Sequence, residues 1–140
     1  MRRYWLMKSE PDVYGWDDLV AAGEGNWDGV RNHRARGNLA AMKVGDRAFF
    51  YHSNIGKEVV GIMRVTKAGL TDPTDPTGTW AAVKVAPVRP LARPVTLTEI
   101  KAEPRLAQNE LVRLSRLSVC EFGKDEWDVV LAMAKRNRAG

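Results

Sequence analysis

The residues best suited to hold a ligand form one short run, Trp27-Asp28-Gly29-Val30-Arg31-Asn32. A protein core does not need this combination, because burying an acid, a guanidinium and an amide together is costly unless each is paired. A site for a planar polar ring can use all of them: an indole stacks, an amide contacts a polar edge, and a guanidinium holds a phosphate. The Asp-Gly pair also favours a turn, so we expect the run on a surface bend.

Three further polar clusters lie on turns or at the ends of predicted strands. They are Lys8-Ser9-Glu10, Tyr51-His52-Ser53-Asn54, and residues 113–118, which end in Leu117 and Ser118. If the strand ends meet at one rim, these clusters and the run 27–32 would line a pocket with an aromatic wall and several hydrogen-bonding groups.

Arginines gather beside two of these clusters. A charge run at a helix start is usually a solvated face, but cations there oppose the helix dipole. Contact with phosphate would compensate, since helix starts also offer free N–H groups to anions. The predicted phosphate-binding residues are Arg31, Arg34, Arg36, Arg113 and Arg116.

Catalysis and metal binding have less support in the sequence. No G-x-S-x-G motif surrounds Ser53 or Ser118, and adjacent residues on an extended segment, such as His52 and Ser53, point to opposite faces. Lys8, Glu10 and His52 remain a conceivable acid/base group of a small hydrolase or deaminase-like site. Two separated histidines and one cysteine give no zinc spacing, and no glycine-rich phosphate loop is present, so we expect no metal and no cofactor.

Length and composition bound the class of protein. A chain of 140 residues, 44% hydrophobic and 28% charged, is expected to form a single domain over residues 1–140. Its net charge of +5 favours an anionic partner, of which nucleic acid is the commonest. The single cysteine, Cys120, excludes an intrachain disulfide, and we expect it to be buried. With no signal peptide and no run of about 20 apolar residues, we expect a cytoplasmic protein with no membrane partner.

The elements that must position these clusters alternate between strands and short helices. Strands are predicted over residues 4–8, 47–52, 58–65, 80–88 and 118–122, with a possible bulge at Gly61. Pro87 and Pro90 are expected to end the fourth strand, and residues 72–78 to form a loop. Helices are predicted over residues 16–22, 33–42, 97–103 and 125–136. Asn32 is the expected N-cap of the second of these helices, and Thr96 is that of the third.

The five tryptophans are expected to differ in role. Trp127 lies on the apolar stripe of the last predicted helix, and Trp5 and Trp80 lie within predicted strands, so all three are expected in the core. Trp16 begins a helix and suits a packing staple. Trp27 has polar neighbours in the sequence. Two roles of its indole are therefore equally compatible with the sequence, a lid packed over the core and a wall on which a ligand stacks.

Several ungapped blocks resemble the EVE domain family, in family order from the first strand to the last helix. The blocks are Tyr4-Trp5-Leu6-Met7-Lys8-Ser9-Glu10-Pro11, Trp27-Asp28-Gly29-Val30-Arg31-Asn32, Lys43-Val44-Gly45-Asp46, Phe50-Tyr51-His52-Ser53-Asn54, Val60-Gly61-Ile62 and Ser115-Arg116-Leu117-Ser118-Val119. The family belongs to the PUA-like superfamily and is similar to YTH domains, which bind a methylated adenine in RNA. The resemblance implies a mixed α/β fold, a curved barrel-like β-sheet flanked by short helices.

The resemblance also implies non-catalytic recognition of a modified base, with modified cytosine in DNA most often proposed. The base-binding residues it implies are Lys8, Ser9, Glu10, Trp27, Gly29, Val30, Arg31, Asn32, Tyr51, His52, Ser53, Asn54, Leu117 and Ser118. Our leading hypothesis is a monomeric reader of a flipped modified base, with DNA favoured over RNA and Trp27 stacking on the ring. The alternatives are an RNA-binding module and a hydrolase of modified nucleosides that uses Lys8 and Glu10.

Overall fold

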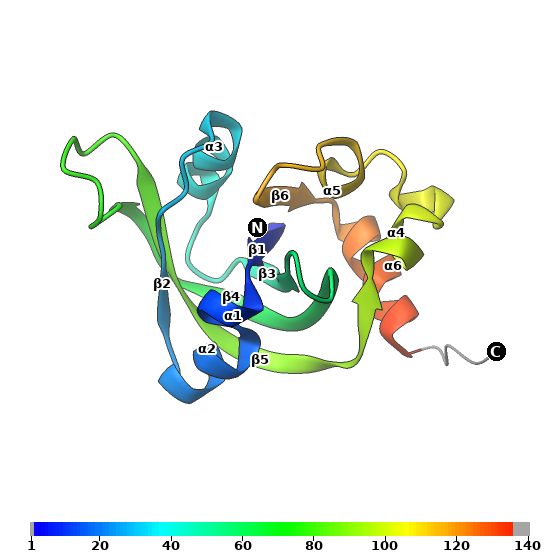
Figure 1. Cartoon of the computed structure of the whole chain (residues 1–140). Helices are drawn as coiled ribbons and strands as arrows, with labels where there is room; N and C mark the ends of the chain where they lie inside the picture. Colours follow the sequence, from blue (N-terminus) through cyan, green and yellow to red (C-terminus); the bar gives the residue numbers. More distant parts are fainter. Residues whose placement is uncertain (1, 136–140) are drawn as a thin grey trace.

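The computed structural model describes residues 2–135, and these form a single six-stranded sheet with short helices around it (Figure 1). The strands are β1 (Tyr4–Ser9), β2 (Gly25–Trp27), β3 (Arg47–His52), β4 (Glu58–Thr71), β5 (Ala81–Thr96) and β6 (Val119–Phe122). The helices are α1 (Pro11–Tyr14), α2 (Trp16–Ala22), α3 (His33–Ala41), α4 (Leu97–Lys101), α5 (Glu110–Arg113) and α6 (Lys124–Lys135), with a 3-10 turn η1 (Pro104–Leu106). The predicted mixed α/β class is confirmed.

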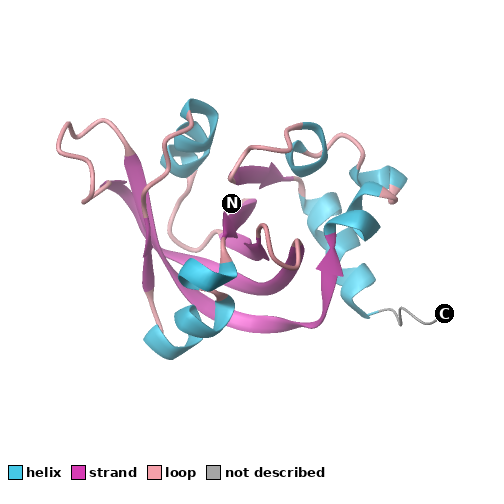
Figure 2. Ribbon diagram, in the orientation of Figure 1, coloured by secondary structure: helices cyan, strands magenta, loops and turns pink. Residues whose placement is uncertain are grey.

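The order of strands in the sheet is β2-β5-β4-β3-β1-β6. β1 runs parallel to β3, and the other neighbouring pairs are antiparallel. The long strands β4 and β5 curve across the molecule instead of lying flat (Figure 2). The parallel pair matters for function, because the carboxyl ends of β1 and β3 reach the same edge of the sheet.

β4 and β5 are longer than the sequence predicts, and the expectation that Pro87 and Pro90 end the strand is wrong. β4 continues to Thr71 and β5 to Thr96. β2 pairs only with residues 83–85 of β5, so the rest of β5 has a strand neighbour on one side only. A proline is tolerated at such an edge, and register shifts between β4 and β5 absorb the remaining irregularity.

A close contact between Trp16 and Gly61 seats helix α2 on the sheet. A Cβ atom at Gly61 would lie 2.6 Å from atoms of the Trp16 ring, so only glycine admits the indole at this distance. Trp16 also meets Phe50 edge to face, with ring centroids 5.7 Å apart. Trp16 is buried, as expected of a packing staple, and the register shift between Val59 and Gly61 confirms the predicted bulge.

The two helices with predicted N-caps, α3 and α4, begin directly after those caps. The side-chain oxygen of Asn32 accepts a hydrogen bond from the backbone N–H of Ala35 at 3.0 Å, and Thr96 forms a capping box with Glu99 at the start of α4. α1, α5 and β2 are absent from the prediction because three or four residues are too few to show a periodicity. The predicted end of the last helix at residue 136 lies outside the described residues.

The core confirms most assignments of apolar residues. Trp5 and Trp127 are buried, and Trp127 stacks on Phe49 with centroids 3.8 Å apart. Cys120 is fully buried, and burial raises the pKa of its thiol to about 12, as expected of an inert core residue. Within residues 2–135, no helix has the length and apolar character needed to cross a membrane.

Trp80 is the exception, since its predicted place in the core is wrong. β5 begins one residue later, and Trp80 is half-buried at the end of the loop between β4 and β5. Its ring lies 5.1 Å from the His33 ring, and the guanidinium carbons of Arg31 and Arg36 lie 5.5 and 5.6 Å from its centroid. The hairpin extends beyond the core here, so Trp80 packs on cations of α3 and the preceding loop.

Candidate functional site

The carboxyl ends of β1 and β3 bring two of the predicted polar clusters together. In the parallel register Lys8 pairs with Tyr51 and Ser9 with His52. The backbone N–H of Lys8 donates to the carbonyl of Ser118 at 2.9 Å, which attaches the loop before β6 to the same edge. The expected convergence of strand ends on one rim is therefore confirmed.

A pocket of about 740 Å³, here called the central pocket, opens at this rim. Its predicted lining residues are Lys8, Ser9, Glu10, Tyr51, Ser53, Asn54, Arg116 and Ser118. Ser115, from the predicted cluster 113–118, also lines it, whereas Lys57, Leu97 and Lys101 are not predicted by the sequence. Four of these side chains are cationic and one is a carboxylate, so the central pocket favours an anionic occupant.

Burial adjusts the charges of this pocket. The Lys8 ammonium donates to the carbonyl of Ser115 at 3.1 Å and lies 5.7 Å from the centroid of the Tyr51 ring. Burial, followed by the nearby charge of Lys101, lowers the pKa of Lys8, and burial raises the pKa of Tyr51 to about 12. Tyr51 therefore stays a neutral phenol.

A second pocket of about 360 Å³, here called the tryptophan pocket, shares Lys8 and Ser9 with the first. Its other lining residues are Val13, Tyr14, Asn26, Trp27 and Asp28. Trp27 is only 7% exposed, because it ends strand β2 and packs edge to face on Phe50 at 5.4 Å. Its indole is therefore both part of the core and a wall of the pocket, and most of its surface is already covered.

The bend after Trp27 is held by a carboxylate from the β4–β5 loop. Gly29 adopts a φ of 75°, a conformation that favours glycine, and its N–H donates to Asp72 at 2.7 Å; residues 28–32 are irregular and form no regular turn, so the predicted turn is wrong. Arg31 donates to the same carboxylate at 2.9 Å, and Thr74 donates to it through its N–H and its hydroxyl. Asp72 is buried; despite the cost of that burial, these hydrogen bonds hold its pKa well below the ordinary value. Gly29 and Arg31 therefore orient the motif, and neither lines the pockets described here.

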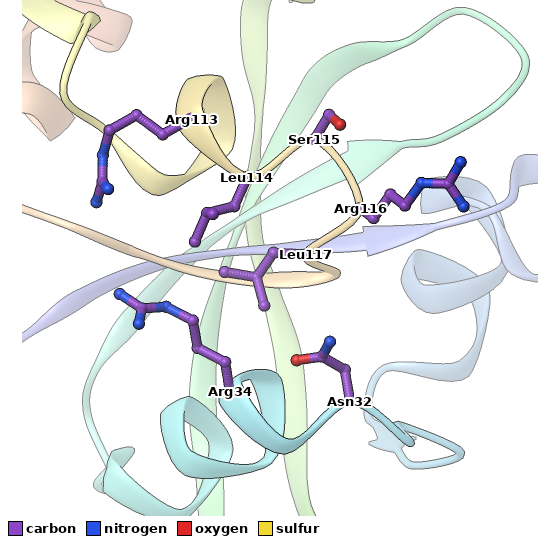
Figure 3. A pocket seen from close by; sticks show the side chains of 7 residues that line it. All are labelled: Asn32, Arg34, Arg113, Leu114, Ser115, Arg116 and Leu117. Atoms are coloured by element: carbon purple, nitrogen blue, oxygen red, sulfur yellow. The ribbon is translucent and has the colours of Figure 1, made fainter.

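A third pocket, also of about 360 Å³, lies between the start of α3 and the loop that follows α5 (Figure 3). This arginine pocket is lined by Asn32, Arg34, Arg113, Leu114, Ser115, Arg116 and Leu117. It thus joins predicted residues from two distant parts of the chain and shares Ser115 and Arg116 with the central pocket.

The three guanidiniums of the arginine pocket differ in how firmly they are held. Arg34 donates through Nε to Glu110 at 2.7 Å, and Arg113 donates through Nε to the carbonyl of Gln108 at 2.8 Å. Arg116 forms no hydrogen bond or ion pair within the described part of the chain and is exposed. Arg116 is therefore the most available cation on this rim.

Some predicted site residues lie elsewhere. The ring nitrogen Nε2 of His52 accepts a hydrogen bond from the backbone N–H of Trp16 at 3.1 Å, on the α2 side of β3. Burial lowers the pKa of His52, which favours the neutral form that can accept this bond. Val30 is buried in the core, and Arg36 lies against Trp80. None of the three lines the central, tryptophan or arginine pocket.

The pockets also include residues that the sequence did not single out. Val13 and Tyr14 belong to the four-residue helix α1, and Lys101 ends α4. No motif marks them, because only the folded chain places these helices beside the ends of β1 and β3. Asp28 belongs to the predicted run 27–32, but its residue type and spacing predict no separate role for its carboxylate.

Comparison with known proteins gives a consistent family. The model of the EVE domain matches residues 3–133. Mouse and human thymocyte nuclear protein 1 are 34% and 33% identical to this chain over 95% of its length and 74% of theirs. Their name is that of a nuclear protein and gives no support to the expected cytoplasmic location.

Solved structures agree with the sequence relatives. An NMR structure of a Rhodopseudomonas palustris protein matches 99% of this chain and 98% of its own, with 46% identity and a TM-score of 0.90. Human thymocyte nuclear protein 1 in complex with DNA containing 5-methylcytosine matches 96% of this chain and 99% of its own, with 32% identity and a TM-score of 0.86. An ASCH protein of Zymomonas mobilis, at 14% identity and a TM-score of 0.56, shares the fold alone. With its family model matched over nearly its whole length, the chain belongs to the EVE domain family.

Proposed function

We propose that this protein binds DNA that carries a modified cytosine and takes the modified base, unstacked, into the tryptophan pocket. The observation that carries the proposal is the likeness to human thymocyte nuclear protein 1, whose structure was solved with DNA containing 5-methylcytosine. The pockets of this chain supply chemistry suited to such a ligand, namely an aromatic wall, hydrogen-bonding groups and a row of cations.

The tryptophan pocket suits the base itself. It combines the Trp27 indole and the Tyr14 ring with the polar side chains of Ser9, Asn26 and Asp28. Unstacking a nucleotide costs a few kcal/mol, so stacking and polar contacts in the pocket must offset that cost. Because Trp27 is already packed on Phe50, we expect its accessible part to form the wall against which the base lies.

The central and arginine pockets suit the phosphates on either side of the flipped nucleotide. Arg116 borders both, Arg34 is held by Glu110 through Nε and Nη2, and Arg113 is held through Nε by the Gln108 carbonyl. A guanidinium fixed in this way loses less conformational entropy when it binds a phosphate. Arg36 stays a predicted phosphate contact, whereas the Asp72 network gives Arg31 a positioning role.

Selectivity for a methyl group alone is expected to be modest. Burying one methyl carbon contributes about 0.8 kcal/mol, roughly a fourfold preference. Stronger selection requires a cavity shaped to exclude water beside the methyl group, or the additional hydroxyl of a hydroxymethyl group.

Single-stranded oligonucleotides that differ at one central base test the proposal without the energy of base pairing. We expect strands with 5-methylcytosine or 5-hydroxymethylcytosine to bind more tightly than the strand with cytosine. Trp27→Phe, which preserves an aromatic core residue but shortens the wall, should reduce that preference. Trp127→Phe is the matched control, because Trp127 stacks on Phe49 away from the pockets. Equal affinity of the wild-type protein for all three strands would refute the proposal.

One structural observation favours the competing hydrolase function: Lys8 and Glu10 line the same pocket. Each already has a partner: Lys8 donates to the Ser115 carbonyl, and Glu10 accepts from the Asn54 amide at 2.8 Å. We propose recognition without catalysis. Hydrolysis of a modified nucleoside by the wild-type protein, lost in Glu10→Gln, would contradict this proposal.

RNA remains the other candidate ligand, because the basic rim suits any phosphate backbone. Matched RNA and DNA strands with the same modified base separate the two. We expect the DNA strand to bind more tightly than the RNA strand. We also expect one copy of the protein per modified base, a stoichiometry that light scattering of the complex measures. The expected cytoplasmic location and monomeric state stay predictions.

A further inference from the structure

Asp28 is a half-buried carboxylate on the wall of the tryptophan pocket, directly after the indole of Trp27. Its side chain forms no hydrogen bond or ion pair within the described part of the chain. Its oxygens are not among the fully buried side-chain atoms, all of which have a partner in the described part of the chain, so a donor on a ligand in the pocket can reach the unpaired carboxylate.

Two donors near Asp28 are already engaged elsewhere. Arg31 directs its terminal nitrogens to Asp72, to the Val30 carbonyl and to the Thr74 hydroxyl. Ser9 donates its hydroxyl to the Tyr14 carbonyl at 2.6 Å. Asp28 is thus left as an acceptor without a donor.

We propose that Asp28 binds the exocyclic amino group of the base and so restricts the tryptophan pocket to cytosine-type bases, excluding thymine and uracil. This inference rests on the proposed function, because it assigns one edge of the same ligand. An ionised carboxylate only accepts hydrogen bonds, and the amino group of cytosine donates them. Thymine presents a carbonyl oxygen at that position, so two acceptors would face each other without a proton.

This contact separates two features of 5-methylcytosine that are otherwise easily confused. The methyl group distinguishes it from cytosine, and the amino group distinguishes it from thymine, which carries the same methyl group. Asp28 acts on the second distinction only. A binding site without Asp28 would therefore still favour methylated pyrimidines but would accept thymine.

The environment of Asp28 strengthens such a contact. Burial, with the nearby charge of Asp72 second, raises the pKa of the Asp28 carboxyl, and the charge of Arg31 opposes that rise. A carboxylate that is partly stripped of water gains more from a ligand donor than an exposed one does. The amide of an asparagine at the same position can turn to offer either an oxygen or an NH₂ group, so it accepts both bases.

The experiment compares three single strands, with 5-methylcytosine, cytosine or thymine at one position. We expect the wild-type protein to bind 5-methylcytosine at least about tenfold more tightly than thymine, the scale of one hydrogen bond to a charged group. Asp28→Asn should bring that ratio to within about twofold. Asp28→Ala introduces no amide that could disturb the segment after Trp27, and it should reduce the ratio in the same way. Asp125→Asn removes an equal charge from an exposed position of helix α6, so it corrects for the general gain in DNA affinity and should keep the wild-type ratio.

The outcomes distinguish this inference from the proposed function. If the wild-type protein prefers 5-methylcytosine to cytosine but binds thymine equally well, the proposed function stands and the role of Asp28 is refuted. The role is also refuted if Asp28→Asn leaves the discrimination against thymine intact. If cytosine and 5-methylcytosine bind alike, both above thymine, and Asp28→Asn removes the difference, Asp28 acts as proposed and the reading of the modification is refuted. If no strand binds, both are refuted.

Discussion

Two carboxylates beside the Trp27 bend show how far position decides the chemistry of a residue. Asp72 accepts hydrogen bonds from Gly29, Arg31 and Thr74, which hold its pKa well below the ordinary value. Asp28 accepts none within residues 2–135, and burial raises its pKa. The first is therefore a structural anion that is already paired, and the second is available to a ligand. Residue type and spacing alone do not distinguish them.

Gly61 provides a prediction at the same scale. Gly61→Ala is expected to destabilise the protein by about 2 kcal/mol, because the new Cβ would meet the Trp16 ring at 2.6 Å and the ring must shift. Denaturant unfolding measures the change in the free energy of unfolding.

Gly37→Ala is the matched control for that substitution. Gly37 lies within α3, and a Cβ there meets no atom within 4 Å, so alanine should stabilise the helix by roughly 0.5–1 kcal/mol. If the two substitutions had the same sign, the contact with Trp16 would not be what requires glycine at position 61.

At the scale of elements, the loop between β4 and β5 supports the binding motif from outside. Asp72 belongs to this loop, yet it fixes the bend at Gly29 and the direction of Arg31. Trp80 closes the same loop against His33 and the neighbouring guanidiniums. The hairpin therefore determines the geometry of the run 27–32 without lining the pocket itself.

Asp72→Asn should consequently weaken both the fold and the binding of DNA. We expect a loss of about 2 kcal/mol in the free energy of unfolding at pH 7, because an amide replaces a carboxylate that accepts charge-assisted hydrogen bonds. Asp75→Asn is the control, since the Asp75 carboxylate accepts hydrogen bonds from Thr77, Thr79 and Trp80 of its own loop. It should cost less stability and leave the discrimination between bases unchanged. An equal effect of the two variants on discrimination would contradict the anchoring role of Asp72.

The pH dependence of stability gives the same prediction a second measurement. The folded pKa of Asp72 lies below its unfolded value near 3.8, so its stabilising contribution is complete above about pH 4 and is lost as the pH falls further. The difference in unfolding free energy between the wild-type protein and Asp72→Asn should therefore shrink below pH 4. A difference that stays constant down to pH 2 would show that the charge of Asp72 is not what matters.

The sequence was sufficient for those elements that follow from local physics. The caps at Asn32 and Thr96 and the bulge at Gly61 all depend on neighbours in the chain. The family resemblance, more than spacing, grouped the polar clusters into one expected pocket. The structure divides that pocket into three. The central pocket shares Lys8 and Ser9 with the tryptophan pocket, and it shares Ser115 and Arg116 with the arginine pocket.

The remaining features depend on contacts between distant segments. Whether Pro87 ends a strand depends on how much of β5 is covered by β2, and whether Trp80 is buried depends on where the hairpin leaves the core. Arg31 has the composition of a phosphate contact, but its engagement by Asp72, 41 residues away, is visible only in the fold. Short helices such as α1 carry no periodic signal, although Tyr14 lines the proposed base pocket.

At the scale of the whole molecule, one group of cations lies along the rim formed by the central and arginine pockets. The net charge is +5, and the cations Lys8, Lys57, Lys101, Arg34, Arg113 and Arg116 border the central and arginine pockets. Phosphate binding at such a rim releases counterions, so affinity should fall as salt rises. The arrangement predicts a strand that crosses the rim while one base enters the tryptophan pocket.

Arg116 is the sharpest test of that path, because it borders two pockets and forms no ion pair within residues 2–135. Arg116→Gln should weaken binding of modified and plain strands by the same factor and reduce the slope of log affinity against log salt by about 0.7 on single strands. Arg64→Gln, an exposed cation on β4 outside the three pockets, should leave the slope unchanged. Equal slopes for the wild-type protein and Arg116→Gln would place the strand elsewhere. A loss confined to the modified strand would instead make Arg116 a contact to the base.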